Sequence, residues 1–131
     1  MIFCKKELAE KIDFGVFPML QGGPHNHQIA GLAAQLKQAA TPEFRDYIKQ
    51  VKSNAKSFAN DMMGKGYKII TDGTDNHIVM MSCIDKGLTG SKFENACDQV
   101  HITLNKNTIL GDKSAMTPGG IRIGTPAVTT R

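Results

Sequence analysis

The sequence lacks the features that mark membrane-spanning, secreted and disulfide-linked proteins. Over its 131 residues no apolar stretch approaches the roughly 20 residues that cross a bilayer, and no signal-peptide pattern opens the chain. Cysteine is scarce: Cys4, Cys83 and Cys97 are an odd number without C-x-x-C spacing. The count and the spacing argue against a disulfide framework and a zinc site, and they indicate free thiols in a reducing compartment.

The chain also lacks blocks of like charge, internal repeats and low-complexity segments. Its formal net charge is +4, but the lysines are scattered, as Lys5, Lys37, Lys52 and Lys68 illustrate. Scattered lysines are typical of solvated helix faces and not of a nucleic-acid surface. Hydrophobic residues at 40% and charged residues at 21% instead predict a globular domain with a real core.

Both ends of the sequence are abrupt. It starts inside an apolar run at residues 1–4 and stops at residues 129–131 without a tapering tail. We therefore expect the chain to be a piece of a larger protein.

The N-terminal part predicts short elements around a loop. Residues 1–4 suit a short buried strand, and residues 5–12 a short one-sided helix. Residues 13–24 hold three glycines and two prolines and are predicted to be loop. Helical spacing of apolar residues then begins, with Asn26 available as an N-cap, and continues to Ala40.

The strongest pattern in the sequence predicts a long second helix. Thr41 and Pro42 stop the preceding helix and start this one, because proline is favoured at the first helical position, and Gly64 and Gly66 suit its C-terminal cap. One apolar stripe follows steps of four and three over about five turns, which is typical of core packing. Its members are Phe44, Ile48, Val51, Ala55, Phe58 and Met62.

Beyond residue 66 the composition moves toward β-branched residues. We predict strands at 67–71, 78–83, 102–104 and 121–125, with a polar turn at 72–76 between the first two, and a short helix over 89–100. The fold class is therefore α/β, with helices first, a small mixed α/β unit afterwards, and a domain boundary near residue 66.

Arg122 lies in a predicted strand between two isoleucines. Because successive strand side chains point to opposite faces, Ile121 and Ile123 share one face and Arg122 the other. Gly120 and Gly124 add little bulk beside the arginine, so its guanidinium is well placed to grip a planar carboxylate with two parallel hydrogen bonds. The alternative is an edge-strand arginine in water or in a structural ion pair.

Residues 21–24, Gln-Gly-Gly-Pro, stand directly before a predicted helix. Consecutive N–H groups at Gly22 and Gly23, next to a helix N-terminus, could hold an anion such as phosphate. The alternative is an ordinary turn. His25 and His27 form an H-x-H pair without a third ligand at sensible spacing, so no metal site is predicted.

The polar stretch 105–118 is long for a connection inside a small unit, and such loops are often functional. Asn105 and Asn107 offer donors and acceptors that suit the amide-like edge of a heterocycle. Asparagines that satisfy turn backbone are the equally good alternative.

Four stretches, taken together and in this order, resemble serine hydroxymethyltransferase: "FPMLQGGPHNHQIAGLA", "GTDNHIVM", "LNKNTILGD" and "GGIRIGTPAVTTR". The resemblance covers essentially the whole chain and looks like the eukaryotic type, since His-Asn-His follows Pro24. It implies a pyridoxal-phosphate enzyme of the aspartate-aminotransferase-like fold, fold type I. That family moves the serine hydroxymethyl carbon to tetrahydrofolate, which gives glycine and 5,10-methylenetetrahydrofolate.

The resemblance also implies roles for residues. Arg122 corresponds to the arginine that holds the α-carboxylate of serine or glycine. Gly22 and Gly23 fall on the loop that reaches the cofactor phosphate of a neighbouring subunit, which implies a homodimer or homotetramer. Asn107 and the turn Ser114, Ala115 and Met116 fall where the family contacts the folate.

The family pattern further implies three parts. Residues 1–41 would end the large cofactor-binding domain, residues 42–66 would be the connecting helix, and residues 67–131 would belong to the small C-terminal α/β domain, truncated here. The stretch "SCIDK" at 82–86 departs from the Asp-Leu-Arg type of sequence that the family usually has after this strand.

One part of the family pattern is missing. The Schiff-base lysine belongs to a Thr-rich His-Lys motif upstream of the Gln-Gly-Gly loop, and Lys5, Lys6 and Lys11 lack that context. We therefore predict no catalytic residue in this chain and expect the isolated chain to be inactive. We also expect exposed apolar surface at residues 1–12 and on the helix at 29–40, with poor solubility or self-association.

Two other functions are compatible with parts of the sequence. A folate-independent aldolase of the same fold, acting on β-hydroxy amino acids, would share most motifs, but the Asn-Lys-Asn loop favours the folate user. A basic module in which Gly22 and Gly23 hold nucleic-acid phosphates is the alternative from another class. We expect a cytoplasmic location, with the mitochondrion as the alternative and no membrane partner.

Overall fold

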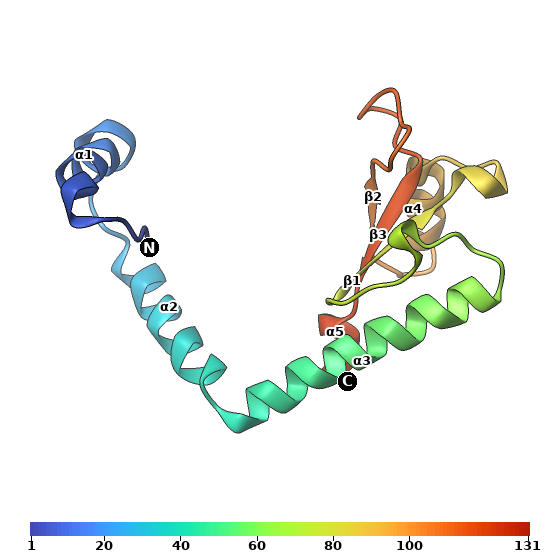
Figure 1. Cartoon of the computed structure of the whole chain (residues 1–131), viewed down its shortest axis with the longest axis horizontal. Coiled ribbons are helices and arrows are strands. Elements are labelled where there is room, and N and C mark those ends of the chain that lie inside the picture. Colours follow the sequence, from blue (N-terminus) through green and yellow to red (C-terminus); the bar gives the residue numbers. More distant parts are fainter. The chain divides into compact units, whose positions relative to one another are not determined.

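The computed structural model describes all residues from 1 to 131, and Figure 1 labels its helices and strands. The chain divides into two compact units, Met1–Ala39 and Ala40–Arg131, and each is described by itself. None of the helices combines the length and the apolar composition that a membrane span requires.

The N-terminal unit is helical. A 3₁₀ turn, Lys6–Leu8, leads into helix α1, Ala9–Phe14, which confirms the short helix predicted at 5–12. The strand predicted at 1–4 is wrong: this stretch finds no partner strand, and its apolar side chains are largely exposed.

The loop predicted at 13–24 is wrong in its first half. A wide helical turn, Gly15–Leu20, continues from α1 and is broken at Phe17. Phe17 is extended, with φ −132° and ψ 127°, because a residue that precedes a proline is pushed out of the helical region. Glycine and proline therefore kink the helical path here without abolishing it.

Helix α2, Asn26–Ala39, follows the predicted apolar spacing. Its start lies one residue earlier than the predicted cap, since the His25 carbonyl accepts hydrogen bonds from the N–H groups of Gln28 and Ile29 at 3.0 and 3.2 Å. No side chain of this unit is buried. The expected exposure of apolar side chains at residues 1–12 and on this helix is confirmed.

The C-terminal unit begins with helix α3, Pro42–Gly64. Proline opens the helix, as predicted. The Thr41 hydroxyl also caps it, accepting a hydrogen bond from the Phe44 N–H at 3.2 Å. The predicted stripe packs inward from Val51 to Met62, and Ala59 joins it, whereas Ile48 near the start of the helix is exposed. At the other end Gly66 has φ +77°, the left-handed conformation that closes many helices.

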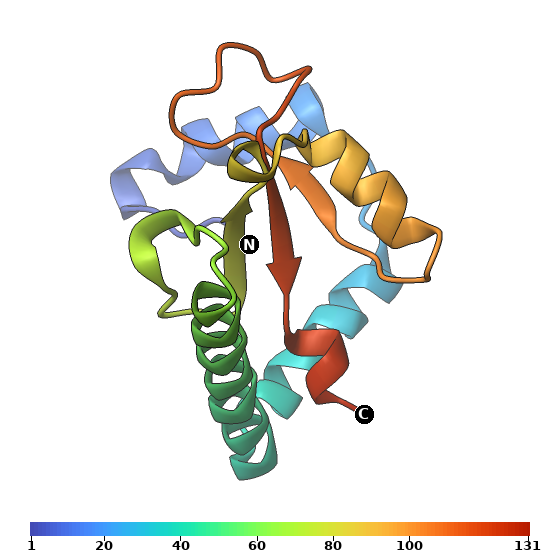
Figure 2. The ribbon, with the colours of Figure 1, turned by 90° about the vertical axis from the view of Figure 1, so that its right-hand side faces the viewer.

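Three antiparallel strands form the sheet of this unit: β1, Ile78–Ser82, β2, Asn105–Asn107, and β3, Gly120–Gly124. Their order is β1-β3-β2, so the last strand in the sequence is the central one, as Figures 1 and 2 show. Helix α4, Gly90–Asp98, is capped by the Thr89 hydroxyl. The short helix α5, Pro126–Thr129, packs against α3.

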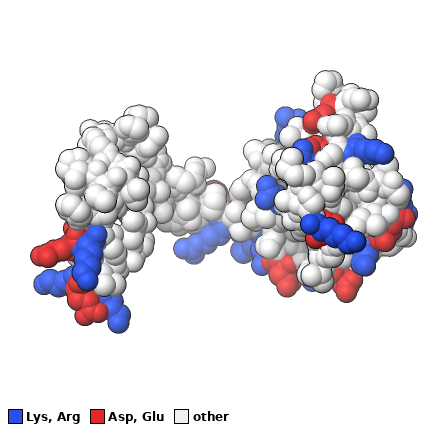
Figure 3. Space-filling model, turned by 90° about the horizontal axis from the view of Figure 1, so that it is seen from above, with Lys and Arg blue, Asp and Glu red and all other residues white.

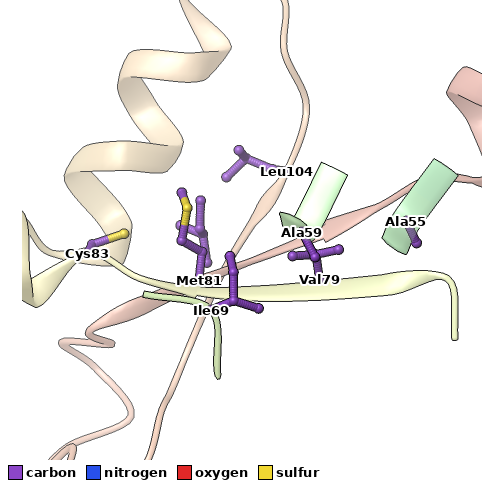
Figure 4. Close-up of a cluster of buried hydrophobic side chains, with 8 residues drawn as sticks. Ala55, Ala59, Ile69, Val79, Met81, Cys83 and Leu104 are labelled. Carbon is purple, nitrogen blue, oxygen red and sulfur yellow. The ribbon is translucent and has the colours of Figure 1, made fainter. Parts of the chain in front are cut away.

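The core lies on one face of this sheet, between the sheet and helices α3 and α4. Figure 4 shows the buried side chains of the strands meeting the small residues of α3. Phe93 and Cys97 of α4 pack against the same cluster. The fully or nearly buried members are Ala55, Ala59, Ile69, Val79, Met81, Cys83, Leu104 and Ile121.

Two predicted strands are wrong. Of residues 67–71, only Ile69 bridges to Met81, because the chain then enters a tight turn at Ile70–Asp72. Residues 102–104 do not pair either. Leu104 turns into the core, and the three polar residues that follow it form β2 instead.

Candidate functional site

Arg122 lies on the central strand, on the face of the sheet opposite the core. It stands opposite Met80 of β1 and Asn105 of β2, while its neighbour Ile121 is completely buried on the other face. The predicted separation of faces is therefore confirmed, and the alternative of an edge-strand position is wrong.

The guanidinium of Arg122 is exposed and largely uncommitted. Its one hydrogen bond is a long one, from Nη2 to Asn105 Oδ1 at 3.4 Å. The two ion pairs of the structure join Lys49 to Asp46 and Lys106 to Glu94, so no carboxylate of this chain neutralises Arg122. The alternative that Arg122 forms a structural ion pair is therefore wrong.

A cavity of about 510 Å³ opens beside Arg122 on this face. Met80 and Asn107 line it together with Ile78 and the segment 70–76. Its volume is within the range of small-molecule sites. The sheet therefore offers one free cation and one amide side chain to a shared cavity.

The segment 70–76 owes its shape to an unusual backbone. Thr71 and Asp72 have φ of +67° and +56°, which β-branched threonine rarely adopts. Two side chains tie the segment to β1: Thr74 Oγ1 donates to the Ile78 carbonyl at 2.6 Å, and Asn76 Oδ1 accepts from the Ile78 N–H at 2.7 Å.

The sequence predicts residues 70 and 71 as the end of a strand and residues 72–76 as a polar turn, and it indicates neither this segment nor Met80 as cavity lining. The strand alternation of 78–83 could have placed Met80 on the open face, but its position opposite Arg122 depends on the register between β1 and β3. The "GTDN" of the turn was the available signal for the segment.

Asn107 is half-buried at the end of β2. Its Nδ2 donates to the Thr108 carbonyl at 2.8 Å, so half of the amide satisfies its own turn and the carbonyl Oδ1 faces no protein donor. The alternative that this asparagine satisfies turn backbone is therefore confirmed for Nδ2, and its contact with a heterocycle stays a prediction. Asn105 is exposed and serves Arg122.

Ser114, Ala115 and Met116 form an exposed turn in the loop between β2 and β3. Ser114 Oγ accepts from the Met116 N–H at 3.1 Å, and the Met116 side chain is 86% exposed. The three residues do not line the cavity beside Arg122.

Gly22 and Gly23 belong to the N-terminal unit, in the stretch that precedes α2. Both are exposed, neither N–H donates to an acceptor in the chain, and a Cβ on either would meet no atom within 4 Å. The two amides thus stay available before a 14-residue helix, and the anion site at Gly22 and Gly23 stays a prediction.

The histidines and thiols take no visible part in a site. The rings of His25 and His27 stack, with centroids 5.7 Å apart, and no group of three or more His, Cys, Asp or Glu side chains gathers closely enough to hold a metal ion. All three cysteines are free, as predicted. Burial raises the pKa of Cys83 and of Cys97, so neither is an activated nucleophile.

The comparisons with known proteins agree on one family. The family model described as Serine hydroxymethyltransferase matches residues 3–131. Serine hydroxymethyltransferase 4 of Arabidopsis thaliana is 58% identical over 125 residues, which are 95% of this chain and 26% of that protein.

Fungal relatives give the same picture. The cytosolic serine hydroxymethyltransferase of Candida albicans is 55% identical over 95% of this chain and 27% of its own length. The mitochondrial enzyme of Schizosaccharomyces pombe is 54% identical over 95% of this chain and 26% of its own length. The chain thus spans about a quarter of the length of the curated relatives it matches, and it belongs to the serine hydroxymethyltransferase family.

Proposed function

We propose that this chain is part of a serine hydroxymethyltransferase, which moves the hydroxymethyl carbon of serine to tetrahydrofolate and leaves glycine. Family membership supports the reaction. The observation that carries the proposal is the uncommitted guanidinium of Arg122, on the open face of the sheet in a cavity shared with Asn107.

Arg122 would bind the α-carboxylate of serine and glycine. A guanidinium presents two parallel N–H groups in one plane, which matches a carboxylate better than an ammonium group does. Because no carboxylate of this chain pairs with it, binding a substrate would require no ion pair to be broken.

Asn107 would contact the folate, together with the turn Ser114, Ala115 and Met116. The free Oδ1 of Asn107 can accept a hydrogen bond from an N–H group of the pterin edge. The exposed turn would add contacts along the same molecule. Tetrahydrofolate is the co-substrate in this proposal.

The residues present fit part of pyridoxal 5′-phosphate. The free amides of Gly22 and Gly23, ahead of α2, suit the phosphate group, and we propose that they serve the cofactor of a neighbouring subunit in a homodimer or homotetramer. When bound, the cofactor supplies an electron sink for negative charge at the substrate Cα. Arg122 would orient the substrate toward it.

We further propose the fold-type I arrangement: residues 1–41 end the large domain, residues 42–66 connect, and residues 67–131 belong to the small domain. Because no residue of this chain matches the Schiff-base lysine motif, the isolated chain should be inactive. Cytosolic relatives support a cytoplasmic location, and a mitochondrial relative marks the other compartment to test.

A segment exchange tests the function. The matching segment of the Arabidopsis relative is replaced by this chain, and the chimera is assayed for serine cleavage with tetrahydrofolate. We expect activity in the chimera and none in the isolated 131 residues. A chimera that folds and binds the cofactor but does not turn over serine would overturn the proposed function.

Within that chimera Arg122→Lys tests the carboxylate contact. Loss of one charged hydrogen bond should lower kcat/KM for serine by roughly 10- to 150-fold. Arg45→Lys is the matched control, because Arg45 is exposed on α3 and should leave the rate unchanged. Equal rates for both variants would remove Arg122 from the site.

A further inference from the structure

The loop between β2 and β3, residues 108–119, extends beyond the end of the sheet in both views (Figures 1 and 2). One carboxylate closes it. Asp112 Oδ2 accepts hydrogen bonds from the Ile109 N–H at 2.9 Å and from the Gly119 N–H at 2.8 Å. A single oxygen therefore ties the first part of the loop to its last residue.

Packing holds this carboxylate in place. A Cβ at Gly119 would lie 2.6 Å from Asp112 Oδ1 and 2.6 Å from Cδ1 of Ile84, so the side chain occupies a slot that only glycine leaves open. A Cβ at Gly120 would in turn collide with Ile109. The two N–H donors, Gly119 first and then Ile109, hold the pKa of Asp112 below its ordinary value, so the group is ionised at neutral pH.

The position of this closure connects it to the site. Ile109 follows Asn107 by two residues, and Gly119 precedes Arg122 by three. Asp112 itself does not line the cavity. It can therefore act on the cavity only through the two strand ends that it holds. It also encloses the exposed turn at 114–116, which lies outside the cavity.

We propose that Asp112 is a positioning residue for the folate: by closing the loop it holds the end of β2, where Asn107 lies, and it holds the turn at 114–116 within the loop. The inference rests on the proposed function. It predicts that changes at Asp112 weaken folate binding and leave serine binding nearly intact, because Arg122 sits inside a paired strand and is held from both sides.

The test uses the chimeric holoenzyme with Asp112→Ala and Asp112→Asn. Alanine removes both hydrogen bonds, so the dissociation constant for tetrahydrofolate should rise about tenfold or more. Asparagine keeps an oxygen that can accept both bonds and loses only the charge, so the rise should be smaller, about threefold. In both variants the KM for serine should stay within about twofold of the parent value.

Asp85→Asn is the matched control, since Asp85 is exposed in the turn Ile84–Lys86 and should change neither constant. Hydrogen exchange of the Ile109 and Gly119 amides gives a second reading, with faster exchange expected in the alanine variant than in the asparagine variant.

The outcomes separate the two proposals. If the parent chimera is active but the alanine variant binds tetrahydrofolate like the parent, or loses serine and folate binding equally, Asp112 is not a positioning residue. If the folded parent chimera is inactive, the proposed function fails, while hydrogen exchange still decides whether Asp112 closes the loop. If the alanine variant does not fold, the asparagine variant decides the question. The proposal requires that its dissociation constant for tetrahydrofolate rises while its KM for serine stays nearly unchanged.

Discussion

Helices form in both units of the chain, but only the C-terminal unit encloses side chains. In residues 1–39 no residue is buried, and Phe3, Leu20 and Ile29 are 87%, 84% and 56% exposed. In residues 40–131 Val79 and Ile121 are completely buried. Local sequence patterns suffice for helices, whereas a core needs elements that are distant in sequence.

Charge follows the same division. No Lys, Arg, Asp or Glu occurs from residue 14 to residue 36, and the face in Figure 3 shows the N-terminal unit largely free of charged groups except at one end. On the C-terminal unit both signs are interspersed. An apolar hollow of about 770 Å³ between Ile2, Phe14 and Phe17 also stays open in the first unit. Exposed apolar surface of this extent is typical of protein interfaces and ligand-binding grooves.

The largest expected difference comes from a matched pair of isoleucines. Ile121→Ala should lower the free energy of unfolding of the C-terminal unit by about 2–5 kcal/mol, because it leaves a cavity in the core. Ile29→Ala should change it by less than about 0.5 kcal/mol. Urea unfolding followed by tyrosine fluorescence measures this unit alone, since the two tyrosines, Tyr47 and Tyr67, both lie in it. Equal effects would show that Ile29 contributes as much as Ile121 to the stability of the C-terminal unit, which would contradict the division into two units.

Alanine substitutions at two glycines, one in each unit, should have effects of opposite sign on stability. A Cβ at Gly90 would collide with the Gly120 carbonyl oxygen, so Gly90→Ala should destabilise the C-terminal unit by about 1–3 kcal/mol. A Cβ at Gly31, inside α2, meets nothing within 4 Å, so Gly31→Ala should favour that helix by about 0.5–1 kcal/mol. Circular dichroism measures the helix content of the Gly31→Ala variant, and urea midpoints measure the stability of the C-terminal unit in the Gly90→Ala variant. A stabilising Gly90→Ala would contradict the packing of α4 on β3.

A helix cap gives a smaller effect inside the C-terminal unit. Thr89→Ala removes the hydroxyl that accepts from the Lys92 N–H at 3.3 Å and should cost about 1 kcal/mol. Thr89→Ser keeps the acceptor and should recover most of the loss. Urea midpoints of the two variants test this, and identical midpoints would mean that the cap contributes nothing.

The smallest effect is a dependence on pH. Lys106 donates from its N–H and its Nζ to Glu94, at 3.1 and 3.0 Å, and these bonds hold the pKa of Glu94 below its ordinary value of 4.5. The folded state therefore binds protons less readily, so the stabilisation is complete above about pH 4.5 and is lost as the pH falls through the folded pKa. Urea midpoints of the parent and of Glu94→Gln should differ at neutral pH and converge as the pH falls through the folded pKa of Glu94. Parallel curves would disprove the contribution.

Elements with a local pattern could be predicted, and elements defined by a distant partner could not. The stripe of α3 and the caps at Thr41 and Thr89 are readable within one or two turns. Strand β2 consists of Asn-Lys-Asn, which carries no hydrophobic signal. It is a strand because Arg122 and its neighbours pair with it, and no local window contains that information.

The candidate site divides in the same way. Alternation alone placed Arg122 away from the core, which is a property of any strand. It could not supply Met80 or the segment 70–76, because these reach the cavity through the register between β1 and β3 and through the positive φ angles at Thr71 and Asp72. The roles of Gly22, Gly23, Asn107 and residues 114–116 remain predictions for the chimera to test.

The strand order has a consequence for biosynthesis. β1 and β2 make no hydrogen bonds to each other. Until residues 120–124 have left the ribosome, β2 therefore has no partner strand and β1 has only the bridge to Ile69. Until then α3 and α4 can form as helices but have no complete sheet to pack against. When β3, which carries Arg122, pairs with both neighbours, it completes the core and the cavity in one step. Such late pairing is slow and leaves strand edges open. Nascent chains halted before residue 120 should therefore be the ones that chaperones hold.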